Sequence, residues 1–186
     1  MEDNNTPSWK TIKTEEVYDT PWISVHHHDV ITPAGTKGIY GTVSFKNRAV
    51  GIVALDPQLN TYIVRQYRYP LKKYSWEIPE GGCPKELSLL EGAKKELREE
   101  AGLLATNWRL IQTLDLSNSA TDEYAEIFLA TGLSQVEQEL EETEDIILRK
   151  LPFESFYEMI LNGEITDAIS VAAGLKIKIM LDRGEI

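Results

Sequence analysis

Cysteine is nearly absent from this 186-residue chain, which has only Cys83 and therefore cannot form an intramolecular disulfide. A single thiol suits a reducing compartment. Long hydrophobic runs are absent too, because no apolar segment approaches the roughly 18 residues of a membrane span. The amino-terminal residues MEDNNTPSWK lack the apolar core of a signal peptide. We therefore expect a cytoplasmic protein with no membrane partner.

Positive charge is also scarce, since 19 lysines and arginines face 30 acidic residues and the formal net charge is −11. Without a basic surplus, the chain has little means of displacing counterions from a nucleic-acid backbone. This excludes nucleic acid as the main partner. A small anionic ligand remains compatible, because a few arginines and a divalent cation would be enough to receive it.

Three consecutive histidines, His26–His28, suggest a metal site at first sight. They lie inside the strand-like stretch 22–31, and neighbouring strand residues point to alternating faces of a sheet. Three adjacent side chains therefore cannot converge on one ion. We interpret them as ordinary strand residues.

The hydrophobic pattern predicts strands interrupted by a few helices, which is typical of an α/β (α+β) protein with a mixed sheet. The short strand at KYSWE is expected to run into a glycine-rich loop at IPEGG. Residues 1–45 carry few apolar side chains, so they are expected to form a small antiparallel sheet that packs on something else; residues 46–186 form the main domain. Expected strands lie at 49–56, 61–68, 108–115, 124–131 and 146–151, and expected helices at 89–101, 153–161 and about 166–181.

The helix expected over 89–101 has the clearest signals. Ser88 and Glu91 match a capping box, and Gly102 suits the left-handed position after a helix. Its end reads KELREEAG, which places Glu96, Glu99 and Glu100 at i, i+3 and i+4 on one face. These carboxylates repel one another and the helix dipole. Either they form a solvated acidic face, or they bind a hard dication through oxygen ligands.

The stretch from Gly81 to Leu103 resembles a Nudix box, whose pattern is G-x5-E-x7-R-E-U-x-E-E-x-G-U with U aliphatic. Glu96, Glu99, Glu100 and Gly102 fall in register without gaps. Two positions depart from the pattern. Leu87 replaces the first glutamate, for which Glu86 or Glu91 are the available substitutes, and Lys95 replaces the arginine.

The resemblance implies a Nudix-like α/β/α sandwich and a metal-dependent hydrolase. It implies that Glu96, Glu99 and Glu100, with the carbonyl of Glu80, bind Mg²⁺ or Mn²⁺, and that Glu99 and Glu100 belong to the catalytic set. A loop glutamate acts as the base, and the late EETED segment places this role at Glu142. Glu141 and Glu144 are its rivals.

Outside the box, AVGIVALD, RQYRYP, WEIPEGG and EETEDI resemble the branch that hydrolyses ADP-ribose and nucleotide sugars. The branch implies that Arg68 contacts the pyrophosphate or ribose. Pairing of Arg68 with an acidic neighbour is the alternative. Lys46, Trp22 and Glu123 are further substrate-binding candidates. The alternatives are that Lys46 flanks an exposed turn and that Trp22 packs as an ordinary strand residue.

The branch also implies a homodimer in which the amino-terminal sheet reaches the partner. A nucleoside diphosphate sugar, ADP-ribose above all, is the first substrate hypothesis, with cleavage to a nucleoside monophosphate and a sugar phosphate. A GDP-sugar or dinucleoside polyphosphate is a second hypothesis. A weakly catalytic nucleotide sensor is a third, and Leu87 favours it.

Overall fold

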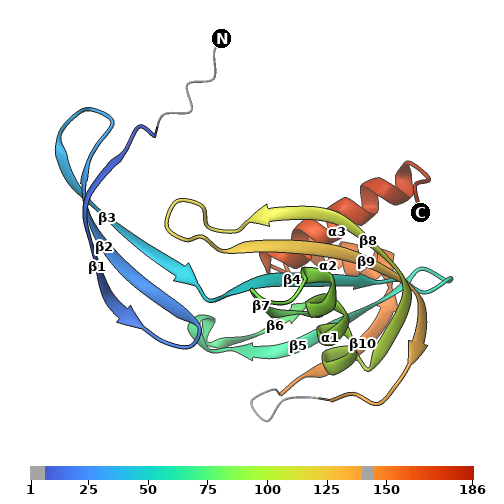
Figure 1. The fold of residues 1–186 in the computed structure, drawn as a ribbon. Coiled ribbons are helices and arrows are strands. Elements are labelled where there is room, and N and C mark those ends of the chain that lie inside the picture. Colours follow the sequence, from blue (N-terminus) through green and yellow to red (C-terminus); the bar gives the residue numbers. More distant parts are fainter. Residues whose placement is uncertain (1–6, 140–144) are drawn as a thin grey trace. The chain divides into compact units, whose positions relative to one another are not determined.

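The structure is a computed structural model, and it describes residues 7–139 and 145–186. Figure 1 shows the order of the elements along the chain. They are β1 (Lys10–Asp19), β2 (Ile23–Ile31), β3 (Lys37–Phe45), β4 (Asn47–Ala54), β5 (Asn60–Arg68), the 3-10 turn η1 (Tyr69–Leu71), β6 (Lys73–Glu77), β7 (Glu80–Pro84), α1 (Leu89–Ala101), β8 (Leu103–Asp115), β9 (Tyr124–Gln135), β10 (Ile147–Pro152), α2 (Phe153–Leu161) and α3 (Ala168–Asp182). Within the described residues, no helix combines the length and apolar character needed to cross a bilayer.

The chain forms two compact units. The first comprises the chain up to Asn47 together with Asp115–Glu123, and the second comprises Arg48–Leu114 and Tyr124–Ile186. The segment Asp115–Glu123 thus belongs with the amino-terminal strands, although it lies far from them in sequence. The assignment of residues 1–45 and 46–186 as separate domains stays a prediction.

The first unit is an antiparallel sheet in the order β1-β2-β3. The histidines lie in β2 as predicted, and His28 hydrogen-bonds the side chains of Thr14 and Thr42, both at 2.9 Å. His27 lies nearest Asp29, at 3.6 Å. Because these rings have different neighbours, the interpretation as strand residues is confirmed.

The segment Asp115–Glu123 is held to β3 by backbone and side-chain hydrogen bonds. The Val43 amide donates to the Ala120 carbonyl at 2.9 Å, and the Phe45 amide donates to Asp122 Oδ1 at 2.8 Å. These bonds link residues more than seventy positions apart. The pattern of residues in a short window of sequence cannot indicate such a pairing.

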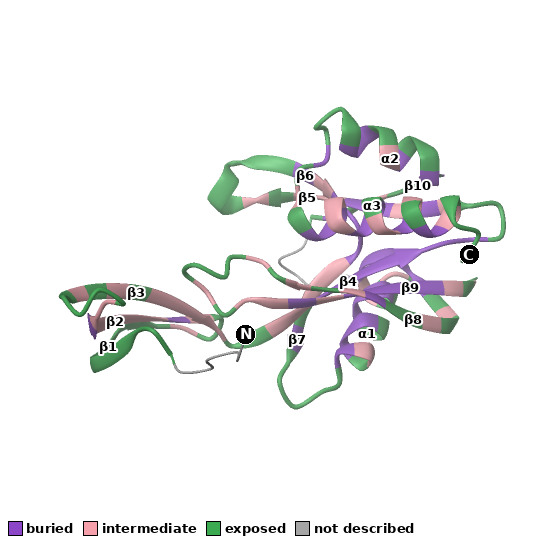
Figure 2. Ribbon diagram, turned by 90° about the horizontal axis from the view of Figure 1, so that it is seen from above, coloured by how far each residue is buried: buried purple, intermediate pink, exposed green. Residues whose placement is uncertain are grey.

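The second unit holds two sheets, with strand orders β7-β4-β9-β8 and β10-β5-β6. Strands β4 and β9 run parallel, which makes the first sheet mixed. Figure 2 shows α1 on one side of this sheet and α3 on the other. Ile169 of α3 packs directly on Gly51 of β4, where a side chain would not fit. The predicted α/β/α sandwich is confirmed, together with the small antiparallel sheet of the first unit.

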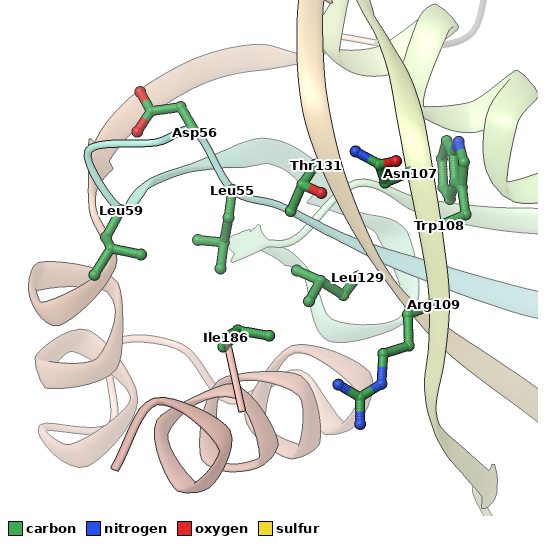
Figure 3. Close-up of a pocket in the computed structure, with 9 residues that line it drawn as sticks. All are labelled: Leu55, Asp56, Leu59, Asn107, Trp108, Arg109, Leu129, Thr131 and Ile186. Atoms are coloured by element: carbon green, nitrogen blue, oxygen red, sulfur yellow. The ribbon is translucent and has the colours of Figure 1, made fainter. Parts of the chain in front are cut away.

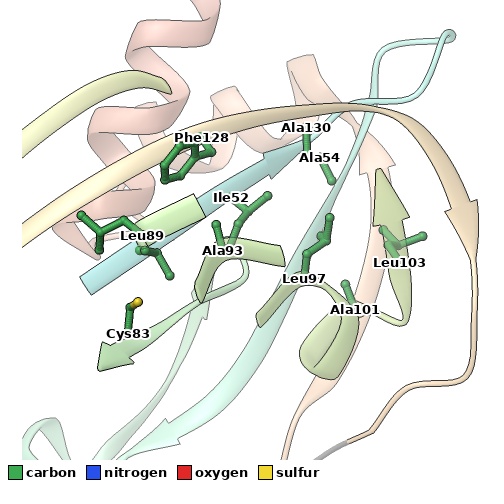
Figure 4. Packing of buried hydrophobic residues seen from close by; sticks show 11 residues of the cluster. Ile52, Ala54, Cys83, Leu89, Ala93, Leu97, Ala101, Leu103, Phe128 and Ala130 are labelled. Atoms are coloured by element: carbon green, nitrogen blue, oxygen red, sulfur yellow. The ribbon is translucent and has the colours of Figure 1, made fainter. Parts of the chain in front are cut away.

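The core beneath α1 consists of small and aliphatic side chains and one phenylalanine, from the helix and from the sheet, as Figure 4 shows. Its buried members are Val50, Ile52, Ala54, Cys83, Leu89, Ala93, Leu97, Ala101, Leu103, Phe128 and Ala130. The leucines and alanines of α1 therefore form an apolar stripe that faces the sheet. Glu96 and Glu100 of α1 lie at the edge of the contact between this helix and the sheet.

Helix α1 begins and ends where the sequence predicts. Ser88 Oγ accepts from the Glu91 amide at 3.2 Å, and Glu91 Oε2 accepts from the Ser88 amide at 3.0 Å, which completes the capping box. Gly102 has φ +60°, and its amide donates to the Arg98 carbonyl at 3.0 Å. Both predictions are confirmed. The sequence could predict the caps because capping depends on residues only a few positions apart.

Two local predictions were wrong. The glycine-rich stretch expected to be a loop forms strand β7, which pairs with β4, and β8 begins at Leu103 instead of Trp108. In both cases a neighbouring strand supplies hydrogen-bond partners to backbone groups that the sequence leaves unassigned. Tertiary pairing therefore outweighs the weak local preference of glycine and polar residues.

Candidate active site

The first element of the site is the meeting of α1 with the start of β7. The Glu80 amide donates to Glu100 Oε2 at 2.8 Å, and a Cβ on Gly81 would overlap the carboxyl group of Glu96. Glu100 is 2% exposed and Glu96 is 8% exposed. The box glycine is therefore required by contact, because only a residue without a side chain lets the Glu96 carboxylate lie against the β7 backbone.

The third glutamate of the helix face lies differently. Glu99 accepts a hydrogen bond from Lys95 Nζ at 2.7 Å, one helical turn away. The lysine that replaces the pattern's arginine thus pairs within the box. The role of Glu99 as a metal ligand stays a prediction.

The second element is a cluster around Arg68 at the end of β5. Arg68 Nε donates to both carboxylate oxygens of Glu77, at 2.9 and 3.0 Å, and Arg68 Nη2 donates to Glu80 Oε1 at 2.9 Å. The pairing with acidic neighbours, which the sequence left as an alternative, is therefore present. The Arg68 side chain remains 35% exposed, so contact with a substrate stays a prediction.

The Asp167 carboxylate caps α3 by accepting from the Ser170 amide at 2.7 Å. Among the described residues, Glu77, Glu80 and Asp167 place carboxylate oxygens within 4.8 Å of one another. Burial raises the pKa of the Glu80 carboxyl well above its ordinary value, with further contributions from Asp167 and Glu77 that outweigh the opposing effect of Arg68. The neutral form of Glu80 is favoured as a result.

We expect Glu80→Gln to mimic the protonated carboxyl, since its amide oxygen still accepts from Arg68. Unfolded Glu80 ionises above its ordinary pKa of 4.5, whereas the folded group retains its proton to higher pH. The folded state therefore binds more protons than the unfolded state. As pH rises, the free energy of unfolding of the wild type decreases relative to that of the variant. Urea unfolding at pH 5 and pH 8 in a chelator measures this difference. Exposed Glu86→Gln is the control, and a pH-independent difference for Glu80→Gln would contradict the assignment.

The residues of the first element fit a divalent ion. Glu96 and Glu100 bring two buried carboxylates to the backbone of Glu80, and hard dications prefer oxygen ligands of this kind. In the Arg68 cluster, however, a guanidinium already offsets part of the negative charge, which makes it the less suitable of the two places for a cation.

The remaining predicted site residues lie in the first unit or outside the described chain. Trp22 is 71% exposed, and Lys46 Nζ pairs with Asp19 Oδ1 at 2.6 Å. The Glu123 carbonyl accepts from the Leu116 amide at 3.0 Å. The predicted base Glu142 and its rivals Glu141 and Glu144 lie outside the described residues.

Sequence reasoning missed Glu77 and Asp167 as members of the site. Glu77 was visible as an acid within the quoted stretch WEIPEGG, and it is 2% exposed. Asp167 lies at the start of the helix predicted over about 166–181, and the sequence gives it no further signal. Their meeting with Arg68 depends on the packing of α3 beside the β6–β7 turn, where the Ile78 amide donates to Ser170 Oγ at 2.9 Å.

An apolar pocket of about 410 Å³ lies elsewhere in the second unit. Figure 3 shows Leu55, Leu129 and Ile186 pointing toward one another there. Its acid, Asp56, pairs with Lys150 at 2.7 Å. Burial opposes ionisation of Asp56, but the hydrogen bonds from Lys150, Asn60 and Gln58 together outweigh it and lower the pKa of Asp56. Of the predicted site residues within 7–139 and 145–186, none lines this pocket. The acidic groups beside β7 are therefore the better candidate for chemistry.

Comparison with known proteins identifies the family of the chain. The NUDIX domain matches residues 45–167, and the nucleoside diphosphate sugar hydrolase N-terminal domain matches residues 9–43. The chain is 32% identical over 176 residues to an ADP-ribose pyrophosphatase of Mycobacterium tuberculosis, covering 91% of this chain and 83% of that protein. It is 30% identical over 161 residues to an ADP-ribose pyrophosphatase of Bacillus subtilis, covering 86% of each. The fold matches a solved structure described as an ADP compounds hydrolase, with a TM-score of 0.84, 20% identity, and coverage of 96% of this chain and 97% of that one.

A mixed sheet between helices, with buried glutamates of one helix against a glycine-bearing strand, defines an α/β hydrolytic domain built around acidic residues. The chain belongs to the Nudix family of pyrophosphohydrolases. Nudix enzymes generally use a divalent metal, which agrees with the donor set of Glu96 and Glu100.

Proposed function

We propose that this Nudix enzyme hydrolyses the pyrophosphate of ADP-ribose or a related nucleoside diphosphate sugar in the presence of Mg²⁺ or Mn²⁺. The observation that carries the proposal is the burial of Glu96 and Glu100 against the backbone of Glu80 and Gly81. Two relatives that are named ADP-ribose pyrophosphatases, and the matched amino-terminal domain of nucleoside diphosphate sugar hydrolases, support this substrate class.

In this proposal, Glu96, Glu99, Glu100 and the Glu80 carbonyl would hold the metal. When bound there, the ion would neutralise the pyrophosphate and lower the pKa of a water. A water oxygen attacks one phosphorus, the bridging P–O bond breaks, and the products are a nucleoside monophosphate and a sugar phosphate. Glu142 accepts the proton that the water loses.

The substrate's phosphates or ribose meet Arg68, whose Nε and Nη2 both donate to Glu77, which leaves the guanidinium oriented and partly exposed. A fixed fork loses little side-chain freedom when it receives an oxyanion. Trp22, Lys46 and Glu123 complete the proposed substrate-binding set. Trp22 offers an exposed ring, and Lys46 offers a cationic group.

We place the enzyme in the cytoplasm as a homodimer. Strand β1 is exposed along its length, and Ile12, Val17 and Tyr18 present apolar surface to solvent. An apolar strand surface of this kind supports packing against a second copy of the chain. Light scattering of the purified protein measures its mass, and a monomer at micromolar concentration would contradict the dimer.

Turnover on a panel of diphosphates tests the proposed function. The panel contains ADP-ribose, ADP-glucose, GDP-mannose, NADH and a diadenosine polyphosphate, each with and without Mg²⁺. We expect metal-dependent release of AMP from ADP-ribose. Absence of turnover on the whole panel would contradict the proposal, and preference for GDP-mannose or the dinucleotide would change the substrate.

The same assay identifies the base. Glutamine substitution of Glu142 is expected to lower turnover while substrate and metal still bind, whereas equivalent changes at Glu141 and Glu144 leave the rate near that of the wild type. An unchanged rate for Glu142→Gln would transfer the role to whichever neighbour's substitution lowers it.

A further inference from the structure

An arginine at the start of β4 holds the loop that enters the box helix. Arg48 Nη2 donates to the Leu87 carbonyl at 2.6 Å and lies 3.4 Å from the Lys85 carbonyl. Strand β4 neighbours β7 in the sheet, so the side chain reaches from one strand to the loop that follows the next. Hydrogen bonds from a charged donor are about twice as strong as neutral ones.

Position 87 is where the Nudix pattern has a glutamate and this chain has leucine. The Leu87 side chain is 40% exposed, and its backbone supplies the contact by accepting from Arg48. Of the two possible substitutes, Glu91 is engaged by the Ser88 amide and hydroxyl at 3.0 and 2.7 Å. Its carboxylate is therefore committed to the helix cap.

The position of this loop determines where α1 begins. The Leu87 amide donates to the Pro84 carbonyl at 3.1 Å, and Ser88 caps the helix directly afterwards. Gly92 packs on Cys83 so closely that a Cβ at Gly92 would lie 2.7 Å from the cysteine Cβ. With no spare volume beneath the first turns, a shift of the loop is transmitted along the helix to Glu96 and Glu100.

The contact gives Arg48 little advantage in stability. Its Nε atom is buried without a hydrogen-bond partner among the described residues. An unpaired buried donor offsets much of what the carbonyl bonds contribute. We therefore expect Arg48 to affect the position of the loop more than the free energy of unfolding.

We propose that Arg48 is a positioning residue of the active site, which anchors the box loop through the Leu87 carbonyl and so replaces the missing box glutamate. The consequence for catalysis rests on the proposed function, whereas the consequence for metal binding and loop mobility does not. Arg48 acts through α1 and does not touch the substrate.

The test compares Arg48→Met and Arg48→Lys with Arg109→Met, a matched loss of charge on β8, where Arg109 pairs with Glu185 at 3.6 Å. Three quantities are measured: Mn²⁺ affinity of the metal-free protein by calorimetry, hydrogen exchange of residues 84–90, and kcat and KM for ADP-ribose. We expect Arg48→Met to weaken Mn²⁺ binding about tenfold and to lower kcat about 10- to 100-fold with little change in KM.

Exchange in the loop should rise in Arg48→Met, while the melting temperature changes little and Arg109→Met resembles the wild type. Arg48→Lys should recover part of the affinity, because lysine keeps the charge but offers no planar fork. Wild-type Mn²⁺ affinity and loop exchange in Arg48→Met would overturn the inference, as would equal losses in Arg109→Met. If the wild type cleaves nothing on the panel, the proposed function fails, and the calorimetric and exchange measurements still decide the role of Arg48.

Discussion

Glu100→Gln is expected to lower ADP-ribose turnover by more than about 100-fold. Changing a residue that only hydrogen-bonds a metal ligand costs up to about 100-fold in activity, and Glu100 is itself a predicted ligand. Glu100 is 2% exposed and accepts from the Glu80 amide at 2.8 Å. The glutamine oxygen still accepts this bond, so the substitution removes the charge and keeps the local geometry. A hard dication loses an anionic ligand as a result.

The fold of this variant should persist. We expect its melting temperature without metal to lie within about 4 °C of the wild type, which corresponds to about 1 kcal/mol for a chain of this size. The increase in melting temperature on adding Mn²⁺ should be lost. Exposed Glu164→Gln is the control for loss of one carboxylate. Full turnover in Glu100→Gln would remove Glu100 from the metal site.

Gly81→Ala has the second large effect, and it acts by contact. The added methyl group would overlap the Glu96 carboxyl group, which is the movable end of a flexible side chain. The carboxylate must therefore turn away, whereas the backbone can stay in place. A misplacement of about 1 Å near reacting groups costs about 100-fold in rate, and we expect a loss of that order in kcat/KM.

The free energy of unfolding distinguishes this effect from a general packing defect. Because only the end of Glu96 has to move, the free energy of unfolding should change by less than the about 1–3 kcal/mol of an overpacked core. Gly41→Ala in β3 is the matched control, since no atom of the described part of the chain lies within 4 Å of its added methyl group. Normal turnover in Gly81→Ala would show that Glu96 does not need to lie against β7.

The box helix could be predicted from sequence almost to the residue. Ser88, Glu91 and Gly102 act on backbone groups within one turn of themselves, so their effect is present in any short window of the chain. The strand character of the three histidines was equally local, because alternation along a strand needs no partner. The acidic face at Glu96 and Glu100 followed from helical spacing.

The glycine-rich entry to the box could not be assigned in this way. Residues Glu80–Pro84 form β7 because β4 lies beside them and pairs with their backbone, and glycine expresses almost no preference of its own. The same limit applies to Asp115–Glu123, which joins the first unit through bonds to β3. Pairing partners that are distant in sequence leave no periodic signal in either segment.

The amino-acid sequence by itself determined the ends of α1 and its acidic face, because the spacing of carboxylates on a helix and the residues that cap it are local properties. Only the tertiary structure decided that Arg68 meets Glu77 and Glu80, that Asp167 joins them from α3, and that Arg48 reaches Leu87. These contacts depend on which strands and helices pack together, and a charged side chain has the same sequence signal whether its partner is solvent or a buried acid.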